Sequence, residues 1–308
     1  MQEAKFQPRR LGHVNLWVSD LEKSIKFYEG ICGIELVRRE RDILIGFHSN
    51  GNTHHDIGII EVSRGKDRYG RDGTLQIPKT RGLSVGLNHL GWEMENEKEL
   101  VDAYSRARAS GFPIQRSVDH LISHSVYVSD PDGNGHEFYA DEMRDWRRIY
   151  NLDFEDEVTG LWDPLAKPPK TDTNYNVDPP IRCVESAPVH PSRIIGTRFA
   201  TTRFDEMRNF FVTVAGLKVV RESSSPAREV GLAGALGRVD LTLVEVPAGS
   251  PAGLQSFRLQ LESDIDVDAV VSKLRASSVD AETGDGRNAN LIIRDPDGFV
   301  IEFQRSAA

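Results

Sequence analysis

Apolar and polar residues alternate along positions 11–18, LGHVNLWV. An alternation with a period of two is typical of a β-strand that has one face in a core. In this strand His13, Asn15 and Trp17 share one face, and the aliphatic residues between them share the other. The strand therefore places an imidazole and an amide on the face that is not purely apolar.

A helix is predicted next, because the following apolar residues recur at a helical spacing. Ser19, with Glu22 three residues later, is typical of a capping box at the N-terminus of a helix, and Gly30 or Gly33 ends this one. Three short apolar runs predict the strands that follow, at 34–38, 43–47 and 57–62. Together these elements make one βαβββ unit.

The same order of elements then begins again. A strand over 87–94 carries His89 near its start, and Asn96 is a suitable N-cap for a helix over 97–110. A hairpin over 121–140 closes this second βαβββ unit. An internal repeat of this kind puts His13 and His89 at equivalent positions, each on the first strand of its unit.

The hairpin carries a carboxylate on a strand that is otherwise largely apolar. Its turn is the DPDG sequence at 130–133, and its return strand places Glu137 and Tyr139 on one face. A buried carboxylate is costly unless it is paired or bound to a metal ion. The alternative is that Glu137 lies on an edge strand and is solvated.

The pattern of elements is repeated in the second half of the chain. Strands and helices are predicted at 194–201, 204–214, 255–262 and 267–277, followed by a hairpin at 291–304 with a second DPDG turn. Proline-rich sequence separates the halves and predicts an extended connector. We therefore expect an α+β fold of two modules, each with two βαβββ repeats in a cupped mixed sheet. The predicted divisions are 1–145, a metal-binding module; 146–192, the connector; and 193–308, a module without the metal ligands.

The two halves differ at the residues that could bind a metal ion. Aligned on strand and turn patterns, His13 corresponds to Thr197, His89 to Arg258, and Glu137 to Glu302. The second module thus lacks both imidazoles. A purely structural role would not explain why both are absent together. A third feature, the polar segment 63–84, is expected to be an exposed loop that covers the site.

Composition narrows the class of partner. The net charge of -9 argues against nucleic acid or an anionic membrane, and two cysteines exclude a disulfide scaffold and a four-cysteine zinc site. The start of the sequence lacks the apolar core of a signal peptide, and no run of about 18 apolar residues occurs. These features predict a cytoplasmic protein with a small-molecule substrate. Self-association to a homo-oligomer is expected, because open sheets have edges to cover.

Two imidazoles and one carboxylate from three strands form the set that suits non-heme Fe(II) and leaves positions open for reactants. His13, His89 and Glu137 are therefore predicted to bind a divalent ion. The alternative is that both histidines are ordinary core residues with hydrogen-bond partners. Their equivalent positions in the repeat, together with the glutamate, favour the metal site.

With these residues the chain resembles the vicinal oxygen chelate superfamily, and within it the type I extradiol ring-cleaving dioxygenases of the catechol 2,3-dioxygenase kind. The resemblance covers nearly the whole chain at the level of repeats. It is most specific from Val118-Asp119-His120 through Val126-Tyr127 and the DPDG turn to Glu137. In the best-known two-module members the C-terminal module holds the metal, whereas here it must be the N-terminal module.

The resemblance implies that His13, His89 and Glu137 hold Fe(II), with Mn(II) as a possible substitute. It also implies that catalytic residues His55, His120 and Tyr127 hydrogen-bond the substrate and move protons; His124 is a rival for the role of His120. The substrates would be a small aromatic diol and O2, and the product a muconic semialdehyde or a relative.

Two other functions remain open at this point. A glyoxalase-like isomerase or lyase uses the same fold with a second glutamate as a fourth ligand, for which Glu61 is the only candidate on the expected strand. A binding protein of the bleomycin-resistance type has no metal, and the predicted triad argues against it.

Overall fold

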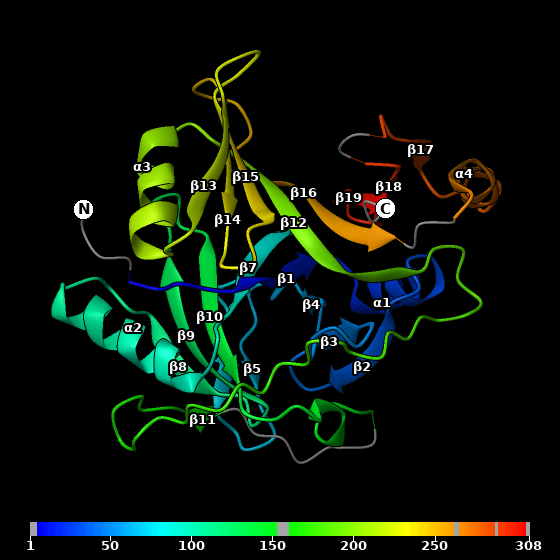
Figure 1. The fold of residues 1–308 in the computed structure, drawn as a ribbon. Helices are drawn as coiled ribbons and strands as arrows, with labels where there is room; N and C mark the ends of the chain where they lie inside the picture. Colours follow the sequence, from blue (N-terminus) through cyan, green and yellow to red (C-terminus); the bar gives the residue numbers. More distant parts are fainter. Residues whose placement is uncertain (1–4, 153–159, 262–264, 287–288, 306–308) are drawn as a thin grey trace.

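The computed structural model describes residues 5–152, 160–261, 265–286 and 289–305. Two large mixed sheets dominate it, with few helices (Figure 1). The first sheet contains the N-terminal half of the chain and the second the C-terminal half. The structure therefore has the expected α+β class and the expected two modules.

The first sheet has nine strands in the order β11-β8-β9-β10-β7-β1-β4-β3-β2. Its strands and helices are β1 (Arg10–Val18), α1 (Leu21–Gly30), β2 (Glu35–Glu40), β3 (Ile45–Ser49), β4 (Ile57–Glu61), β7 (Gly86–Glu93), α2 (Glu97–Ala109), β8 (Arg116–Asp119), β9 (Ser123–Ser129), β10 (Gly135–Asp141) and β11 (Gly160–Leu161). The two βαβββ units meet along the antiparallel pair β1 and β7 at the middle of the sheet.

The second sheet has eight strands in the order β13-β14-β15-β12-β16-β19-β18-β17. Its elements are β12 (Pro191–Thr201), α3 (Phe204–Asn209), a π-helical turn (Phe210–Val214), β13 (Lys218–Ser223), β14 (Glu229–Ala233), β15 (Val239–Glu245), β16 (Gly253–Leu261), α4 (Val267–Ala276), β17 (Ala281–Thr283), β18 (Leu291–Arg294) and β19 (Val300–Arg305). Here too the units meet along an antiparallel pair, β12 and β16.

The ends of the first two helices were predicted with different success. Asn96 caps α2 as expected, because its side chain accepts a hydrogen bond from the backbone N–H of Glu99 at 3.0 Å. The cap of α1 is Asp20, not Ser19, since the Asp20 carboxylate accepts from the backbone N–H of Lys23. A carboxylate also interacts favourably with the positive end of the helix dipole, which favours Asp20 for this position.

The segment 63–84 lies over the site, as expected, but it is not an unstructured loop. It contains the two-stranded sheet β5 (Arg68–Tyr69) and β6 (Leu75–Ile77). Ile77 is buried in the smaller hydrophobic cluster of the first module, where Trp17 also lies. This apolar contact holds the segment against the open face of the sheet.

The connector is mostly irregular but has fixed points in its described part. Its first residues form a 3-10 turn, Trp146–Arg148, and Trp146 is buried. The short strand β11 pairs with β8 and so extends the first sheet. The divisions at 145/146 and 192/193 stay a prediction.

Within the described residues, no helix has the length and apolarity needed to span a membrane.

The pairing of the strands corrects the alignment of the two halves. His13 pairs with Gly91 and Glu137 with the same glycine, whereas Gly196 pairs with Arg258 and Glu302 with the same arginine. Gly196 is therefore the counterpart of His13, in place of the predicted Thr197. The register shifts before His13 and before Gly196 lie at equivalent places in the two strands, so they preserve this correspondence.

The same pairing places Ser256 opposite Val300 and His89 opposite Gly135, so Ser256 is the counterpart of His89. Arg258, predicted for that role, corresponds to Gly91. The loss of both imidazoles in the second module is thus real, although the residues that replace them are a glycine and a serine.

Candidate metal centre

Three neighbouring strands bring the predicted ligands together. His13 on β1, Gly91 on β7 and Glu137 on β10 form one row across the sheet. His89 precedes Gly91 by two residues, so both face the same side of β7. A Cβ atom at Gly91 would lie 2.0 Å from Nε2 of His13, and the imidazole thus occupies the space that this glycine leaves free.

The three side chains converge on one point. Oε2 of Glu137 is 2.9 Å from Nε2 of His13 and 2.9 Å from Nε2 of His89, and the two Nε2 atoms are 3.4 Å apart. For metal–ligand bonds of about 2.1 Å, ligand atoms at right angles to one another lie about 3 Å apart. The spacing therefore fits three ligands on one face of an octahedron, as an ion with open positions requires.

Burial determines the charges of these groups. Burial lowers the pKa of His13 to about 4 and also lowers the pKa of His89, although Glu137 opposes both shifts. Burial alone would raise the pKa of Glu137, but its hydrogen-bonding contacts with His120, His13 and His89 hold that pKa well below the ordinary value. Neutral imidazoles and an ionised carboxylate are the forms that bind a divalent ion.

The arrangement of protons also fits a bound cation. Nδ1 of His89 lies 2.5 Å from Oδ1 of Asn88, an acceptor, and a neutral imidazole carries one N–H. With that N–H on Nδ1, Nε2 of His89 keeps a lone pair that can bind a metal ion. The residues present thus fit a divalent ion.

A hydrogen-bonded chain approaches Glu137 from the other side. The hydroxyl of Tyr127 donates to Oε1 of Glu137 at 2.7 Å, and Nε2 of His120 lies 3.0 Å from that hydroxyl. Since the Tyr127 proton goes to the carboxylate, Nε2 of His120 donates to the Tyr127 oxygen. The structure thus brings both residues to the triad.

His124 lies elsewhere. Its Nδ1 is 2.9 Å from Oε1 of Glu97, and its ring stacks on Trp162 of the connector with centroids 4.3 Å apart. Glu142 and Lys170 complete this cluster, in which Lys170 forms an ion pair with Glu142. The cluster fastens the connector to the first module and takes no part in the triad.

His55 lies directly beside His13. Their rings stack with centroids 4.0 Å apart, and neither ring nitrogen of His55 has a hydrogen-bond partner among the described residues. Burial, followed by the charges of His13 and His54, lowers the pKa of His55 well below the ordinary value. His55 is thus a neutral imidazole whose two buried ring nitrogens leave one donor and one acceptor unpaired.

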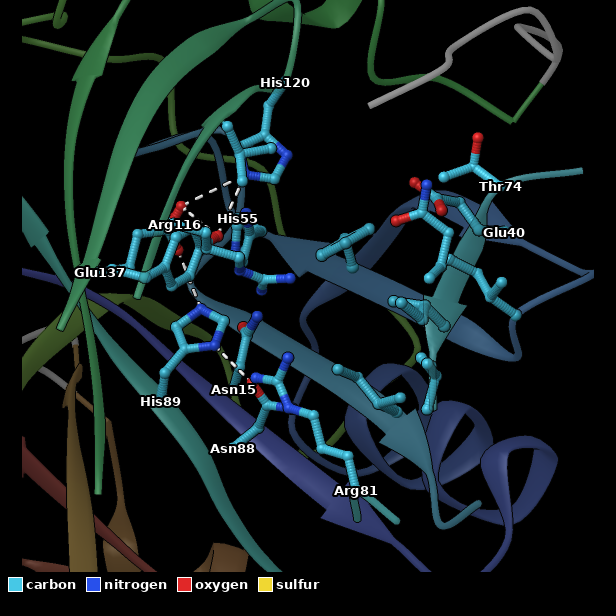
Figure 2. A pocket seen from close by; sticks show the side chains of 18 of the residues that line it. Asn15, Glu40, His55, Thr74, Arg81, Asn88, His89, Arg116, His120 and Glu137 are labelled. Atoms are coloured by element: carbon cyan, nitrogen blue, oxygen red, sulfur yellow. Dashed lines mark hydrogen bonds and ion pairs between the residues drawn. The ribbon is translucent and has the colours of Figure 1, made fainter. Parts of the chain in front are cut away.

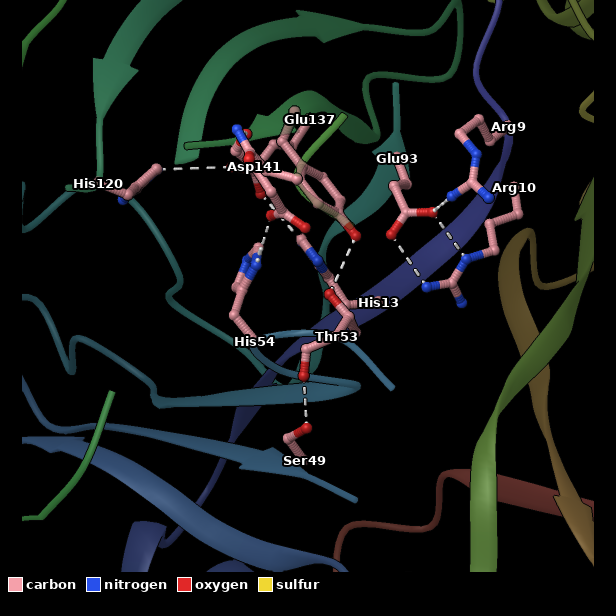
Figure 3. A network of polar contacts seen from close by, with 12 residues as sticks. Arg9, Arg10, His13, Ser49, Thr53, His54, Glu93, His120, Glu137 and Asp141 are labelled. Carbon is pink, nitrogen blue, oxygen red and sulfur yellow. Dashed lines mark hydrogen bonds and ion pairs between the residues drawn. The ribbon is translucent and has the colours of Figure 1, made fainter. Parts of the chain in front are cut away.

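A buried polar network supports this part of the site (Figure 3). Nδ1 of His54 lies 3.1 Å from Oδ1 of Asp141, and the hydroxyl of Tyr139 lies 3.2 Å from Oγ1 of Thr53. The ring of Tyr139 stacks on His13 with centroids 5.1 Å apart. These contacts hold the imidazole rings of His13 and His54 in place. The sequence analysis placed Tyr139 on the correct face but did not single out His54.

A cavity of 470 Å³ opens at the triad (Figure 2). The predicted residues His55, His89, His120, Tyr127 and Glu137 all line it. Residues with an apolar or aromatic side chain form much of the remaining wall, among them Trp17, Ile43, Ile45, Phe47, Ile77 and Tyr150. The cavity therefore has a polar end at the triad and an apolar wall of a kind that an aromatic ring fits.

Several polar residues of this cavity were not among the predicted site residues, namely Asn15, Glu40, Arg81, Asn88 and Arg116. Asn15 shares a strand face with His13, and Asn88 precedes His89, so proximity to the ligands could have indicated both. No local pattern marks the two arginines, which come from different segments of the chain.

Glu61 does not reach the metal centre. Its Oε2 accepts a hydrogen bond from the backbone N–H of Leu21 at 3.1 Å, and its Oε1 forms an ion pair with Arg64. Glu61 therefore lies at the start of α1. Among the described residues, the group formed by His13, His89 and Glu137 contains no second carboxylate.

The second module retains the glutamate but fills the site with protein atoms. Glu302 accepts from Oγ of Ser256 at 2.7 Å and from the Arg258 guanidinium at 2.8 Å. Arg258 stands at the position of Gly91, so its guanidinium group takes the place of a cation beside the carboxylate. Among the described residues, no group of metal-ligating side chains lies here.

Comparisons with known proteins agree with this architecture. A model of the family described as "Glyoxalase/Bleomycin resistance protein/Dioxygenase superfamily" matches residues 10–138 and 193–303. The catechol-2,3-dioxygenase of Bacillus subtilis (strain 168) is 30% identical over 139 residues, which are 45% of this chain and 44% of that protein. The alignment thus spans less than half the length of that relative.

Two solved structures share the fold. The 2,3-dioxygenase LapB from Pseudomonas sp. KL28 has a TM-score of 0.66 at 17% identity, over 99% of this chain and 94% of that chain. The Mn(II)-bound glyoxalase from Novosphingobium aromaticivorans has a TM-score of 0.63 at 14% identity, over 97% of this chain and 82% of that chain. At these identities the likeness is one of fold.

Proposed function

Because the chain belongs to the glyoxalase/bleomycin resistance protein/dioxygenase superfamily, we propose that it is an extradiol dioxygenase that inserts O2 into an aromatic ring beside a vicinal diol. The observation that carries this proposal is the set of donors: two imidazoles and one carboxylate at the spacing of a facial triad, without a second carboxylate in the group. Such a set leaves room for both diol oxygens and for O2. Fe(II) is the proposed metal, with Mn(II) as the alternative.

The proposed roles follow from the positions of the side chains. When bound, the divalent ion would polarise the diol oxygens and lower their pKa values. His55, neutral and free at both ring nitrogens, can take a proton from a diol hydroxyl and return it during ring opening. The substrate ring would lie against the apolar wall of the cavity, which keeps water from the reacting atoms.

Tyr127 and His120 form the opposite, hydrogen-bonding wall. Their chain of hydrogen bonds ends at Oε1 of Glu137 and keeps that carboxylate ionised and oriented. To donate to negative charge that develops on a substrate oxygen, the hydroxyl of Tyr127 would have to turn away from Glu137. Replacement of Tyr127 by Phe is therefore a change in the support of the metal as well as in the active site.

The test loads the protein with Fe(II) under anaerobic conditions, adds a catechol and then admits air. We expect a yellow ring-cleavage product and consumption of one O2 per product. A metal-dependent isomerase would instead turn over a thiol–aldehyde adduct without O2, and a metal-free binding protein would do neither. Absence of O2 uptake with a panel of catechols would contradict the proposal.

The matched variants are Glu137→Gln and Glu302→Gln, which change equivalent glutamates in the two modules. Glu137→Gln should lower the bound Fe(II), measured by elemental analysis, and abolish the product. Glu302→Gln should keep both. Equal loss of iron in the two variants would show that the triad is not the metal centre.

A further inference from the structure

Two arginine side chains face the cavity without a carboxylate partner. Arg81 follows β6 and Arg116 begins β8, and both line the cavity (Figure 2). Both are half-buried, and within the part of the chain that the structure describes neither makes a side-chain hydrogen bond or ion pair to a carboxylate. The guanidinium group of Arg116 lies over the ring of Tyr127, 4.3 Å from its centroid, so its plane is oriented by that ring.

The two cations act on the same region. Burial, and then the charge of Arg116, lowers the pKa of Arg81. The charges of both arginines also contribute to the lowered pKa of His89, after burial. By contrast, the guanidinium of Arg10 in the same module is paired with Glu93. Two like charges that face one cavity without a counter-ion are unfavourable, and an anion from outside the protein would balance them.

The acidic residues of the cavity are occupied elsewhere. Glu137 belongs to the triad, and Asp72 accepts hydrogen bonds from Thr74. Burial raises the pKa of Glu40, and the charges of Arg38, His120 and Arg71 act against this rise. Figure 2 shows Glu40 and Thr74 on the far side of the cavity from Arg81 and Arg116.

We propose that the substrate of this site is an aromatic diol with a carboxylate substituent, and that Arg81 and Arg116 bind this carboxylate. The inference rests on the proposed dioxygenase function and adds a specificity to it. Guanidinium groups match a carboxylate through paired N–H donors. The apolar wall contacts the ring, the triad lies at its diol, and the arginines set the charge of its substituent.

The experiment compares 3-(3,4-dihydroxyphenyl)propionate with its methyl ester, which has nearly the same shape and no charge. Binding to the Fe(II)-loaded protein is measured by anaerobic titration calorimetry, and turnover by O2 uptake. We expect the acid to bind about tenfold more tightly than the ester, because hydrogen bonds to charged groups are the stronger ones. In the double variant Arg81→Gln/Arg116→Gln this preference should disappear, because the affinity for the acid falls to that for the ester.

Arg39→Gln is the control, because it removes one positive charge from a partly exposed site on the same module, where Arg39 pairs with Glu22. It should leave the preference for the acid unchanged. Turnover of catechols with no preference for the acid, or a preference that survives the double variant, would overturn the inference and leave the dioxygenase function intact. Binding of the acid that depends on both arginines, without O2 uptake, would support the anion site and overturn the dioxygenase function.

Discussion

At the scale of single residues, an absent side chain matters as much as the ligands. Gly91 stands between His13 and Glu137 in the row across the sheet, and the imidazole of His13 lies where a Cβ would be. In the second module the glycine is at 196 and the large side chain is Arg258. In the first module β7 carries the glycine and β1 carries the large side chain. In the second module β12 carries the glycine and β16 carries the large side chain.

Gly91→Ala should therefore disturb the metal centre. The added methyl would lie 2.0 Å from Nε2 of His13, so the imidazole must rotate away from Glu137. We expect Fe(II) affinity to fall at least about tenfold, since displacement of one ligand costs more than about 1.4 kcal/mol. The measurement is a competition titration with a metal chelator.

Gly30→Ala is the matched control, because a Cβ at the end of α1 meets no atom within 4 Å. It should keep the metal affinity of the wild type. Wild-type affinity in Gly91→Ala would show that His13 can bind from another rotamer and that the glycine is not required.

At the scale of elements, the two DPDG turns do similar work in different surroundings. In the first turn Asp130 accepts from the backbone N–H of Asn134 and lies 3.1 Å from Nε2 of His136, the residue before Glu137. In the second turn Asp295 accepts from the backbone N–H of Phe299 and from the hydroxyl of Tyr28 in the other module. The first aspartate therefore positions the strand that carries Glu137, and the second joins the modules.

This difference predicts different effects of the same change. Asp130→Asn and Asp295→Asn should each lower the free energy of unfolding by about 1.5–3 kcal/mol, because each loses charge-assisted hydrogen bonds. Asp130→Asn alone should also weaken Fe(II) binding, because β10 carries Glu137. Thermal unfolding and metal titration measure the two effects. A similar loss of metal affinity in both variants would contradict the assignment of the ligand strand to the first turn.

At the scale of the whole molecule, one module is predicted to use a metal ion where the other uses an arginine. The Glu137 carboxylate faces two neutral imidazoles, and the Glu302 carboxylate faces Ser256 and Arg258. The proposed metal ion in the first module and the Arg258 guanidinium in the second would each balance the charge of a carboxylate at the same place in the fold. The second module is then a support for the first, joined to it by buried contacts such as the hydrogen bond from the backbone N–H of Leu11 to Asp240.

Arg258→Met should separate stability from metal binding. Removal of the guanidinium leaves Glu302 with Ser256 alone, and we expect a loss of about 1.5–3 kcal/mol in the free energy of unfolding. The bound iron should stay at one ion per chain, as measured by elemental analysis after gel filtration. A rise to two iron ions per chain would reveal a second metal site in the second module. A fall to zero would show that the proposed location of the metal in the first module is wrong.

The sequence by itself determined the repeats, the Asn96 cap of the second helix and the identity of the converging donors. These features depend on local signals: the period of two in a strand, the DPDG turn and the spacing of histidines within a repeat. Asn96 was predicted in this way and caps α2. His13, His89 and Glu137 were also predicted in this way, and their ligand atoms lie together in the structure.

The tertiary structure decided what local signals do not contain. Strand register placed Gly196 opposite Arg258, because a one-residue irregularity shifts a pairing without a change in the apolar pattern. The cavity brought Arg81 and Arg116 together from distant segments, and of two nearby histidines it selected His120. Such choices depend on which strands are neighbours, and neighbours in a sheet are set by long-range packing.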